Sequence, residues 1–280
     1  MYIPFSIIVL LPSSILIFLI GIFVLLKEKK SNLNRIFFLL SLSVGIWAFS
    51  TFMMFKSCNS ENKLVFWDKI LYIATFFFIA LMYHFSVIFT AKNKKITLTI
   101  AYLIAIFFTI LIFTDYFING VYYYSFGCHT RAQIGHHFYL IYSILFVFLT
   151  LKNLWEFQKE NKENNFIRIQ AKYILIGFFV FSLASIELSL AYGIEIYPIF
   201  YLALPAFIII LAYAITEKNL FPQVLATDIL IAAILIFLFT LLIFPEIEFN
   251  FSSRLVFFIL VSLLCILLLR SVHQEAKRRI

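Results

Sequence analysis

Charged residues are scarce in this sequence. They make up only 13% of the 280 residues, whereas hydrophobic residues make up 64%, and the mean hydropathy is +1.02. Soluble domains contain about 45–50% apolar residues. A soluble core cannot hide such an excess, so we expect lipid to surround most of the chain. The charges gather between apolar runs, which is typical of a polytopic membrane protein.

The sequence also lacks the short motifs of common active sites. It contains no GxxxxGK phosphate loop and no HExxH, GxSxG or GxGxxG motif. Its three cysteines, Cys58, Cys128 and Cys265, do not have the spacing of metal ligands. We therefore expect these 280 residues to form no enzyme, no metal site and no cofactor site.

Long apolar runs are abundant, and they set the expected fold. A helix needs about 20 residues to cross the hydrocarbon, and only closed backbone hydrogen bonding is tolerated there. We expect an all-α polytopic fold with nine spans, of which the eighth and ninth could instead form a shallow hairpin. The spans cover residues 3–26, 36–55, 70–91, 96–114, 138–155, 173–192, 199–215, 229–244 and 251–269.

Basic residues predict the orientation of these spans. With the N-terminus outside and the C-terminus in the cytosol, 17 of the 22 Lys and Arg residues fall in cytoplasmic segments. This is a strong positive-inside pattern. It also explains the net charge of +8 without a nucleic-acid partner.

Two ionisable residues inside the expected spans are candidates for ligand binding or signal coupling, because buried charge is costly in lipid. They are His84 in the third span and Glu187 near the outer end of the sixth. Their depths differ by about 13 Å, so we expect no His–Glu pair. The alternative for each is a polar side chain bonded to a neighbouring helix. Glu187 could also meet a loop cation such as Arg131.

The longest outer loop, residues 115–137, is rich in aromatic residues and holds further candidates. His129, His136 and His137 cluster there with Arg131, and they could sense pH or bind an anion or a metal, although no matching carboxylate or thiol set accompanies them. A solvated loop is the default interpretation. Cys58 and Cys128 lie in outer loops on the same side, which allows either a disulfide or two free thiols.

Several stretches carry a family resemblance through their order along the chain. They include "NRIFFLLSLSVGIWAFSTFMMF", "FWDKILYIATFFFIALMYHFSVIFT" and "YPIFYLALPAFIIILAYAITEKNLF". In this order they resemble the second, third and seventh helices of the N-terminal seven-helix region found in bacterial sensor histidine kinases. The resemblance rests on diffuse hydropathic patterns and brings no ligand residues that can be matched by motif.

This resemblance implies a domain organisation and a function. Residues 1–220 would form the sensor domain, 221–269 two further spans, and 270–280 the start of a cytosolic signalling helix. The chain would be a signal-input module of the bacterial inner membrane, and its implied partners are a second copy and a cytosolic kinase or response regulator. No kinase domain is expected within these residues. A small transporter or channel and a membrane anchor or scaffold are the alternative functions.

Overall fold

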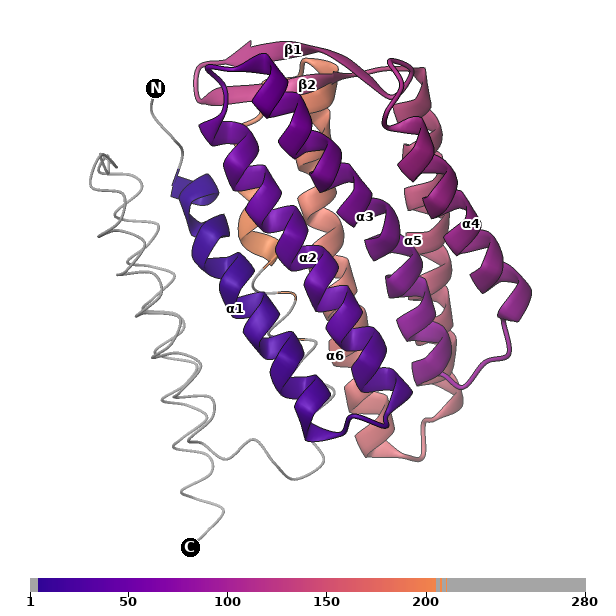
Figure 1. The fold of residues 1–280 in the computed structure, drawn as a ribbon. Coiled ribbons are helices and arrows are strands. Elements are labelled where there is room, and N and C mark those ends of the chain that lie inside the picture. The colour runs from indigo at the N-terminus through magenta and orange to yellow at the C-terminus, as the bar shows by residue number, and fades with distance from the viewer. Residues whose placement is uncertain (1–4, 205–206, 208–209, 211–280) are drawn as a thin grey trace, which may run out of the picture. The chain divides into compact units, whose positions relative to one another are not determined.

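A computed structural model of the chain describes residues 5–204, 207 and 210 (Figure 1). The described residues belong to one compact unit. Its elements are α1 (Phe5–Lys27), α2 (Asn32–Lys56), α3 (Glu61–Phe89), α4 (Lys95–Leu111), β1 (Ile118–Tyr124), β2 (Gly127–Ala132), α5 (Ile134–Glu160), α6 (Asn165–Leu183), and the 3₁₀ helices η1 (Ala184–Tyr192) and η2 (Phe200–Leu202).

Polar residues in the short connections begin the helices. The Ser31 side chain accepts a hydrogen bond from the Asn34 amide at the start of α2, and Asn164 does the same for Ile167 at the start of α6. Each side chain supplies a hydrogen-bond acceptor to a backbone amide that has no partner within the first turn of its helix. Asn34 also donates its side-chain amide to the Val24 carbonyl near the end of α1, at 3.0 Å. The α1–α2 connection is therefore fixed by hydrogen bonds as well as by packing.

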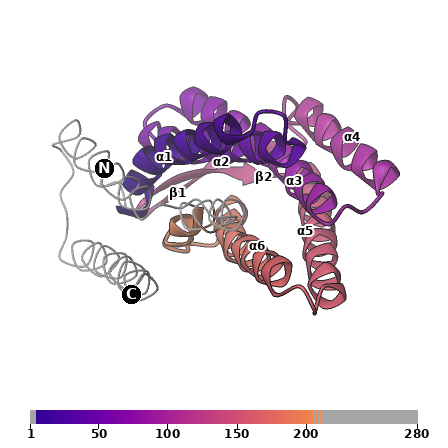
Figure 2. The same cartoon turned by 90° about the horizontal axis from the view of Figure 1, so that it is seen from below.

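The helices run alternately up and down the bundle. Helix α2 packs between α1 and α3, and α5 packs against α3 and α6 (Figure 2). Aromatic rings fill the contacts between them: the Phe78 and Phe181 ring centroids lie 4.1 Å apart, and Trp47 meets Phe181 edge-on at 5.3 Å. Such pairs stabilise a core beyond the area they bury. On the outside of α4, Ile96 and Ile110 are 79% and 67% exposed, as expected of side chains that face lipid.

Five of these helices are long and apolar enough to cross a membrane, and α4 is a shorter apolar helix. The first six predicted spans coincide with α1 to α5 and with α6 continued by η1. The predicted spans 229–244 and 251–269, most of 199–215, and the domain boundaries at 220/221 and 269/270 lie outside the described residues. The structure therefore agrees with a polytopic membrane protein over the part that it describes.

The expectation of a purely helical chain is wrong in one place. Residues 118–132, within the expected outer loop, form an antiparallel hairpin in which Tyr124 pairs with Gly127 and Ile118 pairs with Ala132. The register shifts near Gly120, whose φ of 80° is a conformation that glycine adopts without strain. The hairpin lies across one end of the bundle, which we call the hairpin end (Figure 1). The opposite end, with the connections 28–31, 90–94 and 161–164, is called the basic end.

The sixth span also differs from a regular α-helix. After Leu183 the chain continues for nine residues as η1, which ends at Gly193 with a φ of 81°. Runs of 3₁₀ helix longer than three or four residues are uncommon, and those that interrupt a helix often mark a hinge. The hairpin end therefore contains the two irregular parts of an otherwise helical unit.

Candidate functional site

The hairpin is joined covalently to the end of α2. Cys58 follows α2 and forms a disulfide with Cys128 in β2, across 70 residues of sequence. Next to it, the ring of Phe55 packs against Gly127 so closely that a Cβ there would lie 2.5 Å from the ring. A glycine is therefore needed where the strand meets the helix. The structure thus brings together the two cysteines that the sequence placed on one side.

Strand β2 is also hydrogen-bonded to a buried carboxyl group of α3. Thr130 of β2 donates its hydroxyl to Asp68 of α3, and both side chains are fully buried. Beside them, His129 is also buried, with its ring nitrogen bonded to the Thr130 carbonyl at 3.0 Å. The second Asp68 oxygen has no hydrogen-bond partner within the described residues. A buried polar atom without a hydrogen-bond partner destabilises the folded state, so the presence of Asp68 here carries a stability penalty.

A histidine–tyrosine network joins three elements beneath the hairpin. The two ring nitrogens of His136 in α5 lie 2.7 Å from the Tyr192 hydroxyl of η1 and 2.9 Å from the Tyr72 hydroxyl of α3. A neutral imidazole has one donor and one acceptor, so one tyrosine donates and the other accepts. His137 stacks on the Tyr192 ring and bonds the same hydroxyl at 3.0 Å. The interpretation of these residues as a solvated loop is wrong for His129 and His136, because both side chains are buried.

Glu187 lies in η1 and is 2% exposed. One oxygen accepts a hydrogen bond from the Phe200 amide at 2.7 Å and so caps the start of η2. The other oxygen has no partner within the described residues. Arg131, the cation suggested for Glu187, lies instead over the Tyr122 ring at 4.6 Å. Glu187 therefore links η1 to η2 rather than to the hairpin.

His84 lies apart from this cluster. Its ring nitrogen is 2.9 Å from the hydroxyl of Tyr102, so it links α3 to α4. This is the interhelical pairing that the sequence offered as the alternative to a functional role. The structure thus brings His136 and His137 together and leaves His84 elsewhere.

The tip of the hairpin contacts the segment that contains η1. Tyr124 donates its hydroxyl to the Leu190 carbonyl, and Ser125 donates both its amide and its hydroxyl to Glu195, at 3.1 and 2.7 Å. We call these four residues the latch. The bonds from Ser125 lower the pKa of the Glu195 carboxyl, and burial raises the pKa of Tyr124 to about 12. Glu195 is therefore charged and Tyr124 neutral at neutral pH.

The latch and the disulfide together define what the site can do. The hairpin is attached to α2 by the disulfide, to α3 by the Thr130–Asp68 hydrogen bond and to η1 by the Tyr124–Leu190 hydrogen bond. Within residues 5–204, no group of three His, Cys, Asp or Glu side chains is placed to hold a metal ion.

Sequence reasoning missed Asp68, Thr130 and the tyrosines of the network. Asp68 was overlooked because the expected third span began at residue 70, which placed the carboxyl outside lipid. Its position in the apolar stretch "FWDKIL" was the available signal. No sequence signal distinguished the tyrosines of the network, because aromatic residues are common throughout the chain.

One comparison with known proteins gives a match. Residues 9–224 match the family model described as the N-terminal 7TM region of histidine kinase, which covers well over half of the chain. No curated protein and no solved structure matches the chain.

Proposed function

The chain belongs to the family of N-terminal seven-transmembrane regions of histidine kinases, and we propose that it acts as the signal-input module of a two-component system. The chain is a multi-pass membrane protein, as its family and its apolar, lipid-facing helices indicate. Its place in the bacterial inner membrane and its coupling to an output are parts of the proposal.

The hairpin end faces the outside in this proposal. Two observations support that orientation. The basic end lies in segments predicted to be cytoplasmic, which hold 17 of the 22 Lys and Arg residues. The hairpin end contains the Cys58–Cys128 disulfide, and disulfides persist in oxidising compartments.

The two-sided attachment of the hairpin is the observation that carries the proposal. A stimulus that displaces the hairpin pulls on η1 through Tyr124 and Glu195, while α2 and α3 stay fixed through Cys58 and Asp68. Because η1 is a 3₁₀ segment, it can change its winding at a lower cost than a regular helix. Two packing states that differ by only a few kcal/mol then suffice for a switch.

The remaining parts of the module are proposed from the sequence pattern and its resemblance. Residues 221–269 would add two spans, and residues 270–280 would begin a helix that carries the change to a cytosolic kinase or response regulator. A homodimer is the expected assembly. Glu187 would relay the movement of η1 to the seventh span, since it caps η2.

A chimaera with a histidine kinase core joined after residue 280 tests the coupling. We expect Tyr124→Phe to change the basal autophosphorylation by about threefold or more, because one hydrogen bond contributes about 1 kcal/mol. Tyr123→Phe is the matched control, since this neighbouring tyrosine is exposed. Equal phosphorylation in the wild type and both variants would contradict the proposal. A loss of substrate uptake by vesicles on Glu187→Gln would favour a transporter.

A separate experiment tests the orientation. Cysteines introduced by Ser125→Cys at the hairpin tip and Asn161→Cys at the basic end should differ in their labelling in intact cells. A membrane-impermeant maleimide should label the first and not the second. The reverse pattern would place the hairpin in the cytosol and refute this part of the proposal.

A further inference from the structure

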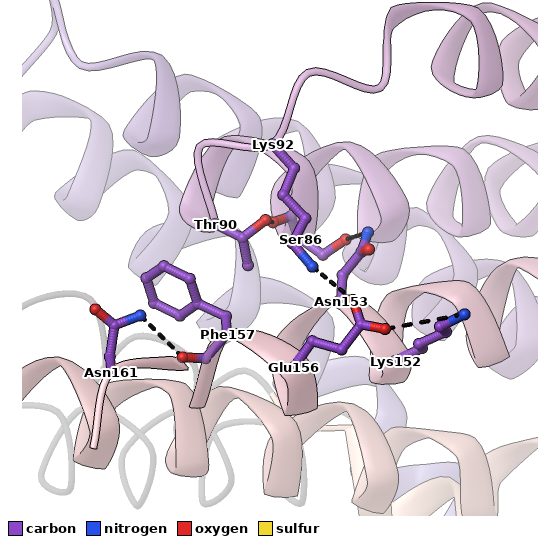
Figure 3. Close-up of polar contacts among 8 residues, drawn as sticks. All are labelled: Ser86, Thr90, Lys92, Lys152, Asn153, Glu156, Phe157 and Asn161. Carbon is purple, nitrogen blue, oxygen red and sulfur yellow. Dashed lines mark hydrogen bonds and ion pairs between the residues drawn. The ribbon is translucent and has the colours of Figure 1, made fainter. Parts of the chain in front are cut away.

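Charged side chains at the basic end are paired with one another. Glu156 of α5 lies 2.7 Å from Lys92 and 3.9 Å from Lys152 (Figure 3). The same view shows Asn153 donating to Ser86, so the polar groups between α3 and α5 bind each other there. The Glu156 charge is therefore compensated within the protein.

A small cavity at the hairpin end has a different arrangement of charge. It lies where the start of α3 meets the hairpin, and its volume is about 210 Å³ (Figure 1). Its wall combines α3, the connection after α4 and both strands. The polar residues that line it are Glu61, Asn62, Lys69, Asp115, Asn119 and Thr130. Charges of both signs and two amides therefore surround one small space.

The three charges around this cavity are not used by the described part of the fold. Among residues 5–204, Glu61, Lys69 and Asp115 form no ion pair. Glu61 and Asp115 are exposed, and Lys69 is half-buried with its ammonium 5.7 Å from the centre of the Phe113 ring. An ammonium above a ring keeps N–H donors that can bind an anion. All three charges are therefore open to a ligand.

One residue of the wall links the cavity to the buried contacts of the hairpin. Thr130 lines the cavity and donates its hydroxyl to Asp68, which lies buried in α3. An occupant of the cavity would thus touch the residue that attaches β2 to α3. This contact gives bound ligand a short route to the bundle.

We propose that the cavity binds a free basic α-amino acid such as lysine. Two carboxylates and one ammonium surround the cavity, and lysine carries the opposite set of charges. Glu61 and Asp115 would pair with the two ammonium groups of the ligand, and Lys69 with its carboxylate. The Asn62 and Asn119 amides can add hydrogen bonds. That the amino acid is the stimulus rests on the signalling role proposed above.

Charge should also select against related ligands. A neutral α-amino acid has one ammonium group, so it would leave a carboxylate of the cavity unpaired. A diamine has no carboxylate, so it would leave Lys69 unpaired and repelled. Ligands that lack either group should therefore bind more weakly than lysine.

Calorimetric titration of the full chain in detergent with L-lysine at low salt tests the site. We expect Glu61→Gln/Asp115→Asn to weaken binding by about tenfold, the equivalent of two exposed ion pairs. Lys69→Gln should weaken it by about threefold. Lys63→Gln removes the same charge from the same helix outside the cavity and should change the affinity by less than about 1.5-fold.

The same titration tests the chemistry of the ligand. L-norleucine lacks the side-chain ammonium and cadaverine lacks the carboxylate, so each should bind about threefold more weakly than lysine or worse. Equal affinity for all three ligands would overturn the proposal, as would equal lysine binding by the wild type and Glu61→Gln/Asp115→Asn. Displacement of lysine by Ca²⁺ at equal concentration would assign the carboxylates to a metal ion instead.

The site and the signalling role fail separately. An absence of lysine binding at about 10 mM would overturn the site, and the effect of Tyr124→Phe on the kinase chimaera would still stand. Lysine binding that leaves the phosphorylation of the chimaera unchanged would support the site and contradict only its role as the place where the stimulus binds.

Discussion

At the hairpin end a disulfide joins elements that are distant in sequence, whereas at the basic end the described residues are joined by hydrogen bonds such as Asn34 to Val24 and by part-exposed ion pairs. Cys58–Cys128 and Asp68–Thr130 lie out of water, but Glu156 and its lysine partners are in contact with it. Buried and covalent links keep one geometry, while exposed ion pairs are weak and are screened by salt. The difference indicates that the disulfide restrains the hairpin end, whereas the Glu156 ion pairs at the basic end are easily broken.

Removal of the disulfide should have the largest effect on this comparison. Cys58→Ser/Cys128→Ser should lower the free energy of unfolding by about 2–4 kcal/mol, because the link restrains a long stretch of the unfolded chain. Denaturation in mild detergent measures the change, and Cys265→Ser is the matched control. Equal stability of the control and the double variant would show that the hairpin end does not depend on its covalent link.

Loss of the Thr130 hydroxyl should come next. Thr130→Val leaves the Asp68 carboxyl with neither oxygen bonded, so we expect a loss of about 1–3 kcal/mol. Thr130→Ser keeps the hydroxyl and should recover most of that loss in the same denaturation experiment. If serine and valine destabilised the protein equally, packing of the methyl group rather than the hydrogen bond would hold the strand.

Acidification should weaken the latch before the rest of the hairpin end. The folded pKa of Glu195 lies below its ordinary value of 4.5, so its contribution is complete above that pH and is lost as the pH falls through the lower folded pKa. The Ser125 amide should show this titration by NMR, because it donates to Glu195. Glu195→Gln should abolish the inflection. An unchanged inflection in that variant would assign the titration to another group.

Disruption of the ion pairs at the basic end should have the smallest effect. Glu156→Gln removes the partner of both Lys92 and Lys152, and we expect a smaller change in stability than for any of the changes above. The difference from the wild type should shrink further at high salt. A loss as large as that from Thr130→Val would contradict the distinction between the two ends.

The helices could be predicted from the sequence, whereas the hairpin and η1 could not. Long apolar runs located α1 to α5, because hydrophobic length and the positive-inside pattern are local signals. The hairpin was expected as a loop, since its tyrosines and glycines also suit turns. Its attachment to α2 and α3 involves Cys58 and Asp68, which are distant in sequence. The change from α6 to η1 gave no local signal either, because residues 184–192 are compatible with an ordinary helix and the hairpin contacts them only in the fold.

Hydrogen exchange of the amides in residues 184–192 tests the central claim most directly. If the hairpin holds η1 through the latch, Tyr124→Phe should speed exchange there by about fivefold, the equivalent of about 1 kcal/mol, while α2 and the Tyr123→Phe control keep the wild-type rates. Exchange in 184–192 that is the same in the wild type and in Tyr124→Phe would contradict the account, because the Tyr124 hydroxyl would then contribute nothing to holding η1.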